Sequence, residues 1–301
     1  MTFLVTVALW IAALAGLSAC VSAPPPADSH YNRGVAYYDE GKLADAIDSY
    51  QLALRQNPKD SFAKYNLAVV YQDQGRLDEA AGLYKEILQA FEDARSRINL
   101  AAIYQARGEE DQALLELEKA AETHRDNPHP ASVLGDYLER KNRLPEAERR
   151  YLEALKIDDK HAVTHFRLGR LYLKQGKTDQ GVERLLDATE LAPDVPEYLE
   201  ALGDEYERRD KTLEAIHALE QVSVLQPDRA ELFARLGDLY KKKNFYKEAA
   251  VRYWTAISIK DDNPAVHRRL KEIFEALTQT EQDWLNANKE QGALARNNRN
   301  K

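Results

Sequence analysis

Small and apolar residues recur along the chain with a period of about 34 residues. A glycine or alanine marks each period, at successive spacings of 34, 33, 34, 34, 34 and 34 residues: Gly34, Ala68, Ala101, Gly135, Gly169, Gly203 and Gly237. An aromatic residue or leucine follows each of them three residues later: Tyr37, Tyr71, Tyr104, Leu138, Tyr172, Tyr206 and Tyr240. Residues three apart share one face of an α-helix. The pattern therefore predicts a helix at the start of every period.

The second half of each period carries the same kind of signal. A small residue recurs at Ala46, Ala80, Ala113, Ala147, Gly181, Ala215 and Ala249. Four residues further on stand Tyr50, Tyr84, Leu117, Tyr151, Leu185, Leu219 and Tyr253. Between the two halves lie residues suited to positive φ, namely Gly41, Gly75, Gly108, Asn142, Gly176 and Asn244. Each period is thus predicted to be a helix-turn-helix repeat.

One such repeat cannot bury its own apolar face, so neighbouring repeats must stack. The predicted repeats cover residues 27–60, 61–93, 94–127, 128–161, 162–195, 196–229 and 230–263. A further helix over 264–278 is expected to cap the stack, which then occupies residues 30–278. We expect a polar, partly disordered tail over 279–301, because the apolar pattern fades there.

This periodicity resembles the tetratricopeptide repeat over residues 27 to about 277, nearly the whole chain after the N-terminal segment. The resemblance implies an all-α, right-handed solenoid of seven helix-turn-helix repeats plus a C-terminal capping helix. It also implies a concave groove that is lined by the first helix of each repeat and binds a protein or peptide partner.

The sixth position of each repeat lines that groove in the family. In the first three repeats this position is Asn32, Asn66 and Asn99, which resembles the asparagine ladder of the O-GlcNAc transferase superhelix. An asparagine amide both donates and accepts, so it can match one peptide unit of an extended ligand. The predicted peptide-binding set also includes Tyr31, Tyr38, Phe62, Tyr65 and Arg95. The alternative interpretation is that asparagine is merely common at this position.

The later lining positions are charged. They include Arg167, Arg235, Glu200 and Asp204. Two interpretations remain open for this region. It is either a second, charge-selective site or a set of salt bridges within the groove.

The N-terminal segment is a candidate targeting signal. Residues 3–17 are almost entirely apolar, and Leu17-Ser18-Ala19-Cys20 follows at their end. This resembles the bacterial lipobox, in which the signal is cut before a cysteine that carries lipid. The resemblance implies a signal peptide over 1–19, lipid on Cys20 and a proline-rich tether over 20–29. It places the protein in the bacterial envelope, on the outer membrane facing the periplasm. The alternative is an uncleaved anchor with an incidental cysteine.

Composition and motifs give little sign of catalysis. The 50 acidic and 42 basic residues give a net charge of −8, which argues against nucleic-acid binding. The sequence has no glycine-rich phosphate loop, HExxH, GxSxG or CxxC motif. His161 and His165 are four apart, but no third ligand completes a metal set. We therefore expect no enzyme activity, cofactor, metal or small-molecule substrate.

The resulting hypothesis is a lipid-anchored scaffold that holds an extended segment of a protein partner. Family members with a lipobox followed by such repeats favour a role in pilus or secretion-system assembly. The alternative is an adaptor or regulatory subunit for a cell-wall hydrolase or another envelope enzyme. A structural homo-oligomer is a third class.

Overall fold

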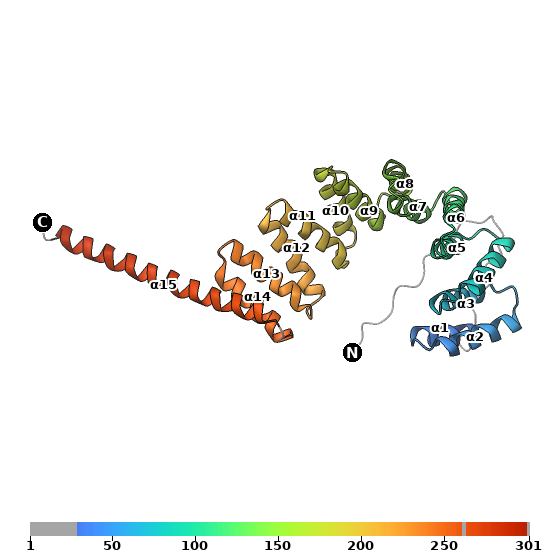
Figure 1. The fold of residues 1–301 in the computed structure, drawn as a ribbon, viewed down its shortest axis with the longest axis horizontal. Coiled ribbons are helices and arrows are strands. Elements are labelled where there is room, and N and C mark those ends of the chain that lie inside the picture. Colours follow the sequence, from blue (N-terminus) through green and yellow to red (C-terminus); the bar gives the residue numbers. More distant parts are fainter. Residues whose placement is uncertain (1–28, 261–262, 300–301) are drawn as a thin grey trace, which may run out of the picture. The chain divides into compact units, whose positions relative to one another are not determined.

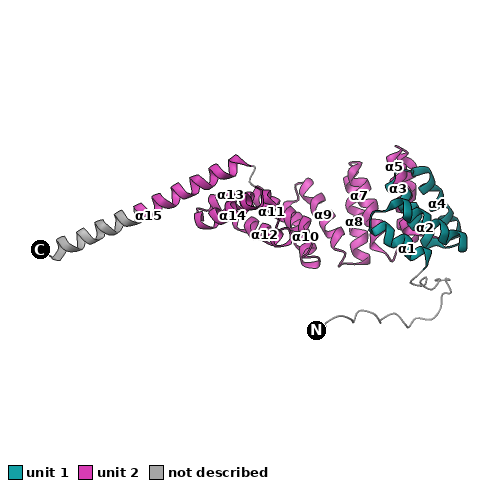
Figure 2. Ribbon diagram, turned by 90° about the horizontal axis from the view of Figure 1, so that it is seen from below, with its two compact units in different colours: residues 1–91 teal, residues 92–301 magenta. Residues whose placement is uncertain are grey.

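The computed structural model describes residues 29–260 and 263–299, with side chains described as far as residue 282. Cys20 and the predicted signal and tether lie outside these ranges, apart from residue 29. The chain divides into two compact units, residues 1–91 and 92–301 (Figure 2).

Helices are the regular secondary structure of the described residues, which contain no strand. In the first compact unit they are α1 (His30–Asp39), α2 (Leu43–Gln56), α3 (Ser61–Asp73) and α4 (Leu77–Ala90). In the second they are α5 (Ala94–Ala106), α6 (Glu110–Thr123), α7 (Pro128–Arg140), α8 (Leu144–Ile157), α9 (Ala162–Lys174), α10 (Thr178–Leu191), α11 (Pro196–Arg208), α12 (Thr212–Leu225), α13 (Ala230–Lys242), α14 (Tyr246–Ile259) and α15 (Pro264–Arg299). Helices α1 to α14 pack as seven successive pairs, and α15 packs on α14 (Figure 1). The predicted all-α fold of seven helix pairs and a final helix is confirmed.

Every pair turns in the same way. Three residues join its two helices, and the middle one has a φ between 57° and 75°: Gly41, Gly75, Gly108, Asn142, Gly176, Asp210 and Asn244. The next amide donates back to a carbonyl five residues earlier, as from Lys42 to Tyr37 at 2.8 Å and from Lys211 to Tyr206 at 2.8 Å. This is the Schellman arrangement, which satisfies carbonyls at the helix end.

Inside each pair, a small residue of the first helix meets a large one of the second. A Cβ atom placed on Gly34 would lie 2.6 Å from Tyr50 Cδ1, and one on Gly135 would lie 2.6 Å from Tyr151 Cε1. Both tyrosines are almost completely buried. The absence of a side chain on the first helix therefore makes room for the ring of the second.

The last helix closes the apolar core of the final pair. Val266, Leu270 and Ile273 on α15 join a buried cluster with Phe233 of α13 and Tyr253 of α14. The helix then continues to Arg299. The helix thus extends beyond the cap over 264–278 that the sequence pattern predicted. Residues 279–299 contain no proline and are mostly good helix formers, so loss of an apolar pattern does not end the helix.

Candidate functional site

In the first compact unit, two of the predicted ladder residues lie on the first helices. Asn32 is on α1 and Asn66 is on α3, and both are half-buried. Asn66 Nδ2 donates a hydrogen bond to Tyr31 Oη at 3.1 Å, across the two helices. The structure thus brings two of the predicted binding residues, Tyr31 and Asn66, into direct contact.

The neighbouring aromatic residues differ in how they present their rings. Tyr38 Oη donates to Asp73 Oδ2 at 2.7 Å, and this hydrogen bond is the main reason that the pKa of Tyr38 is raised. The Tyr65 ring packs edge-on against the buried Tyr84, with ring centres 5.8 Å apart. Phe62 is 42% exposed. It is therefore the most available of these rings for a partner.

The remaining predicted binding residues of this set, Asn99 and Arg95, lie on α5 in the second compact unit. Asn99 is half-buried. Arg95 is exposed, and its Nε lies 3.4 Å from Asp93 Oδ1. Asn99 and Arg95 therefore belong to the second compact unit, whereas Asn32 and Asn66 belong to the first.

The predicted charged region of the second unit is a set of ion pairs between successive first helices. Arg235 of α13 contacts Glu207 Oε1 through Nε and Asp204 Oδ1 through Nη2, each at 2.6 Å. Burial lowers the pKa of Arg235, but hydrogen bonds and charge from these two carboxylates outweigh it, so the pKa is raised overall. Glu200 pairs with Arg229, which precedes α13.

The last residue predicted in this region, Arg167, points elsewhere. Its Nη1 donates to Ser132 Oγ of α7 at 3.1 Å. The structure therefore brings Arg235 and Asp204 together and places Arg167 in a different contact.

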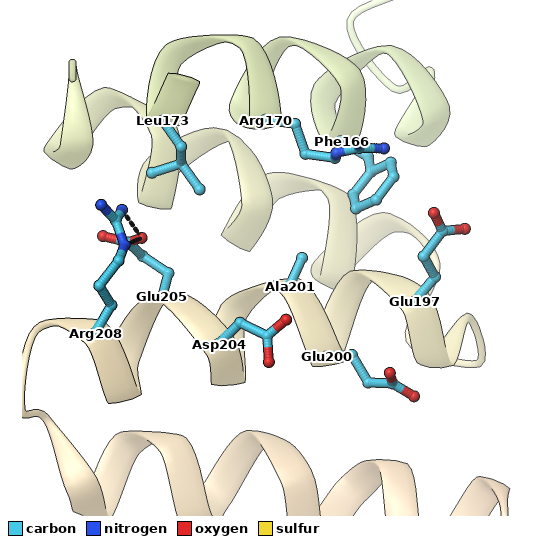
Figure 3. Close-up of a pocket in the computed structure, with 9 residues that line it drawn as sticks. All are labelled: Phe166, Arg170, Leu173, Glu197, Glu200, Ala201, Asp204, Glu205 and Arg208. Atoms are coloured by element: carbon cyan, nitrogen blue, oxygen red, sulfur yellow. Dashed lines mark hydrogen bonds and ion pairs between the residues drawn. The ribbon is translucent and has the colours of Figure 1, made fainter. Parts of the chain in front are cut away.

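Beside these pairs, the second unit has an open hollow between two first helices. Its volume is about 580 Å³. Helix α9 contributes Phe166, Arg170 and Leu173, and α11 contributes Glu197, Glu200, Ala201, Asp204, Glu205 and Arg208 (Figure 3). The Arg170 guanidinium lies 5.6 Å from the centre of the Phe166 ring. The hollow thus combines an apolar lining with carboxylates and guanidinium groups.

The sequence interpretation did not single out Glu205, a charged residue of this hollow. Its side chain is only 2% exposed. Oε2 accepts from Arg208 Nε at 2.9 Å, whereas the buried Oε1 has no hydrogen-bond partner among the described residues. The repeat register carries a signal that would have found it, because no other repeat has a charged residue at this position.

The two histidines considered as metal ligands have other contacts. His161 Nδ1 lies 2.6 Å from Thr164 Oγ1, and His165 Nε2 lies 2.8 Å from the Asp159 carbonyl oxygen. His165 Nδ1 faces Asp187 Oδ2 at 3.2 Å. Within the described part of the chain, no group of three or more side chains is arranged to hold a metal ion.

Over residues 29–260 and 263–299, no helix is both long enough and apolar enough to cross a bilayer.

Stacked helix pairs with small-residue contacts and identical turns define a class of helical-repeat solenoid proteins. One family model described as a tetratricopeptide repeat matches residues 8–61, 31–95 and 65–130, and a second model with the same description matches residues 138–204. Together they span more than half of the 301 residues. The chain belongs to the tetratricopeptide repeat family.

Solved structures share this fold at low sequence identity. A tetratricopeptide repeat protein from Parabacteroides merdae has a TM-score of 0.52 and 20% identity, over 81% of this chain and 97% of that one. The C-terminal part of a tetratricopeptide repeat protein from Cytophaga hutchinsonii has a TM-score of 0.57 and 12% identity, over 80% of this chain and 99% of that one. A chain of the APC/C hetero-tetramer Cut9–Hcn1 has a TM-score of 0.55 and 15% identity, over 80% of this chain and 48% of that one. No curated protein matches the sequence.

Proposed function

We propose that this protein is a non-catalytic scaffold that holds an extended segment of a partner protein against its first helices. Tetratricopeptide repeats serve protein–protein interaction, and this chain has that fold. The observation that carries the finer proposal is the hollow between α9 and α11, which is lined by first helices alone. A surface of this kind, which places apolar side chains between charged groups, suits an amphipathic side chain of a peptide.

The asparagines supply the other half of the proposed recognition. Asn32 and Asn66 lie at the same position of successive repeats in the first compact unit, and Asn99 lies at that position on α5. Their amides can pair with backbone groups of an extended chain, which recur at regular intervals. Tyr31, which already accepts from Asn66, and exposed Phe62 supply contact area beside them.

A binding experiment tests this placement. Peptides selected from a random library on the full chain serve as ligands, and affinity is measured by fluorescence anisotropy. Replacing Asn32, Asn66 and Asn99 together by alanine should weaken binding at least tenfold, since each lost hydrogen bond contributes about 0.5–1.5 kcal/mol and one decade is about 1.4 kcal/mol. Circular dichroism should show unchanged helicity.

The matched control is a double variant, Arg167→Ala with Arg235→Ala. It should keep binding within about threefold, because both side chains already have partners within the protein. Loss of binding in this variant, with affinity retained in the asparagine variant, would show that binding depends on Arg167 or Arg235 and not on the asparagines.

We further propose that Cys20 carries lipid and anchors the scaffold in the bacterial envelope. The support is the segment Leu17-Ser18-Ala19-Cys20 at the end of an apolar run. Cys20→Ser should abolish incorporation of labelled fatty acid and move the protein from the membrane fraction to the soluble fraction. A variant that remains fully processed and membrane-bound would refute lipid attachment at this residue.

Within the envelope we place the scaffold in pilus or secretion-system assembly, with an adaptor for a cell-wall hydrolase as the alternative. A deletion strain separates the two roles. Loss of assembled pili or of a secreted substrate, with normal cell division, supports the first. Chains of unseparated cells with normal pili support the second.

A further inference from the structure

Glu205 occupies a position where every other repeat carries an uncharged residue. The corresponding residues are Ala36, Val70, Ile103, Tyr137, Leu171 and Leu239. From the second repeat onward this position is buried, and Glu205 is as buried as its counterparts, with 2% of its side chain exposed. The chain therefore holds a carboxylate where its other repeats carry an uncharged side chain: five aliphatic residues and Tyr137, whose hydroxyl group donates to Glu110.

The contacts of Glu205 satisfy only one of its two oxygens. Oε2 accepts from both Nε and Nη2 of Arg208, one turn further along α11. Oε1 is buried and has no hydrogen-bond partner within residues 29–260 and 263–282. Figure 3 shows the carboxylate beside the Arg208 guanidinium, at the end of the hollow near Leu173.

Folding alone does not account for this arrangement. A buried carboxylate oxygen without a donor destabilises the folded state. Arg208 offsets this only in part, because its side chain is 61% exposed and the pair lies within one helix. Replacing a buried ion pair by apolar side chains is often neutral or stabilising. A charge kept at a cost to stability, at the edge of a hollow, points to a ligand.

The rest of the hollow indicates the chemistry of that ligand. Its lining has four carboxylates and two guanidinium groups, and Glu197 is an exposed carboxylate with no ion-pair partner in the described part of the chain. Phe166, Leu173 and Ala201 supply apolar surface between these charges. Such a lining suits a cationic side chain with an apolar stem or an apolar neighbour.

We propose that the hollow between α9 and α11 binds a lysine or arginine side chain of the partner segment, with Glu205 as its buried acceptor. The proposal rests on the peptide-binding function proposed above and names the side chain that the hollow selects. The bound cation donates to Glu205 Oε1, and the exposed Arg208 side chain moves toward solvent. An apolar residue next to the cation contacts Phe166 and Leu173.

The first test is the selection of peptides from a random library of linear heptapeptides on the full chain. Enrichment of a lysine or arginine next to an apolar residue is expected. Enrichment of sequences without a basic residue would overturn the proposal and leave the peptide-binding function standing. Failure to enrich any sequence would overturn both.

The second test uses the best enriched peptide and a version with norleucine in place of its basic residue. The wild-type protein should bind the basic peptide at least tenfold more tightly. In Glu205→Leu this preference should disappear, while the melting temperature stays equal or rises. Glu205→Gln keeps the shape of the side chain and should also lose the preference. Retention of the full preference in both variants would overturn the proposal.

A matched control removes one negative charge outside the hollow. Glu146 on α8 has 42% of its side chain exposed and pairs with Arg143. Glu146→Gln changes net charge by the same amount as Glu205→Gln. It should keep the preference for the basic peptide within twofold. An equal loss in Glu146→Gln would show that overall charge, not Glu205, selects the cation.

Discussion

The glycines of the first helices set how closely the two helices of a pair approach. Gly34, Gly135 and Gly237 each face a buried tyrosine ring of their own pair, and an added Cβ would lie 2.6 Å from it. Gly82 on α4 is the opposite case, because no atom lies within 4 Å of the position a Cβ would take. The same residue type therefore has opposite roles at different positions of the repeat.

This contrast gives a prediction for two alanine substitutions. Gly135→Ala should lower the free energy of unfolding by about 1–3 kcal/mol, since the Tyr151 ring must move from a packed position. Gly82→Ala should raise the free energy of unfolding by up to about 1 kcal/mol, because alanine has a higher helix propensity than glycine at an exposed helix position. Urea denaturation followed by circular dichroism measures both. Destabilisation of similar size in the two variants would contradict the packing described here.

The sequence predicts many, but not all, of the residues with special roles. Regular spacing identified the buried tyrosines and the left-handed glycines and asparagines, because these roles depend on backbone geometry that repeats. It missed Asp210, which also has positive φ, because aspartate adopts that conformation less readily than glycine or asparagine. Ion-pair partners such as those of Arg235 depend on side-chain rotamers, which spacing does not determine.

Among the elements, α15 shows how one helix can serve two environments. Its first part buries Val266, Leu270 and Ile273 against the last pair, whereas Phe274 is 54% exposed. The periodic apolar positions predicted the buried part. The continuation to Arg299 was missed, because a helix without a core-facing stripe has no periodic signal and depends on intrinsic propensity alone.

Two neighbouring residues of α15 test its capping role. Ile273→Ala removes a fully buried side chain and should destabilise the last pair by about 2–5 kcal/mol. Phe274→Ala, one residue away, should change stability by no more than about 0.5 kcal/mol. Hydrogen exchange of α13 and α14 amides reports the difference. If protection there is unaffected by Ile273→Ala, α15 does not cap the final pair.

At the scale of the whole molecule, successive helices pack on their neighbours along the chain. In the second unit, for example, α8 packs on α7 and α9, and α14 packs on α13 and α15. Stability in such an array is nearly a sum of repeat terms and nearest-neighbour terms. Damage at one point is therefore expected to remain local.

Ala147→Phe provides the corresponding prediction. Ala147 on α8 is fully buried. A phenyl ring there should overpack the helix pair and lower its free energy of unfolding by about 1–3 kcal/mol or more. Hydrogen exchange should accelerate in α7 to α10 and stay at the wild-type rate in α13 and α14. A uniform acceleration throughout the second unit would indicate a single cooperative unit instead.

The identical three-residue turns bear on how a gene of this kind can change length. Each turn places one left-handed residue at the same point and returns the chain in the same direction, whichever of glycine, asparagine or aspartate occupies that point. Duplication of a segment encoding 34 residues adds a complete helix pair that includes its own turn with a left-handed residue. Recombination can therefore lengthen the protein by whole repeats. After a single-codon insertion in a turn, the glycine, asparagine or aspartate no longer occupies the position that requires positive φ. Selection is therefore expected to tolerate gains and losses of entire repeats far more readily than small frame-preserving insertions at these seven places.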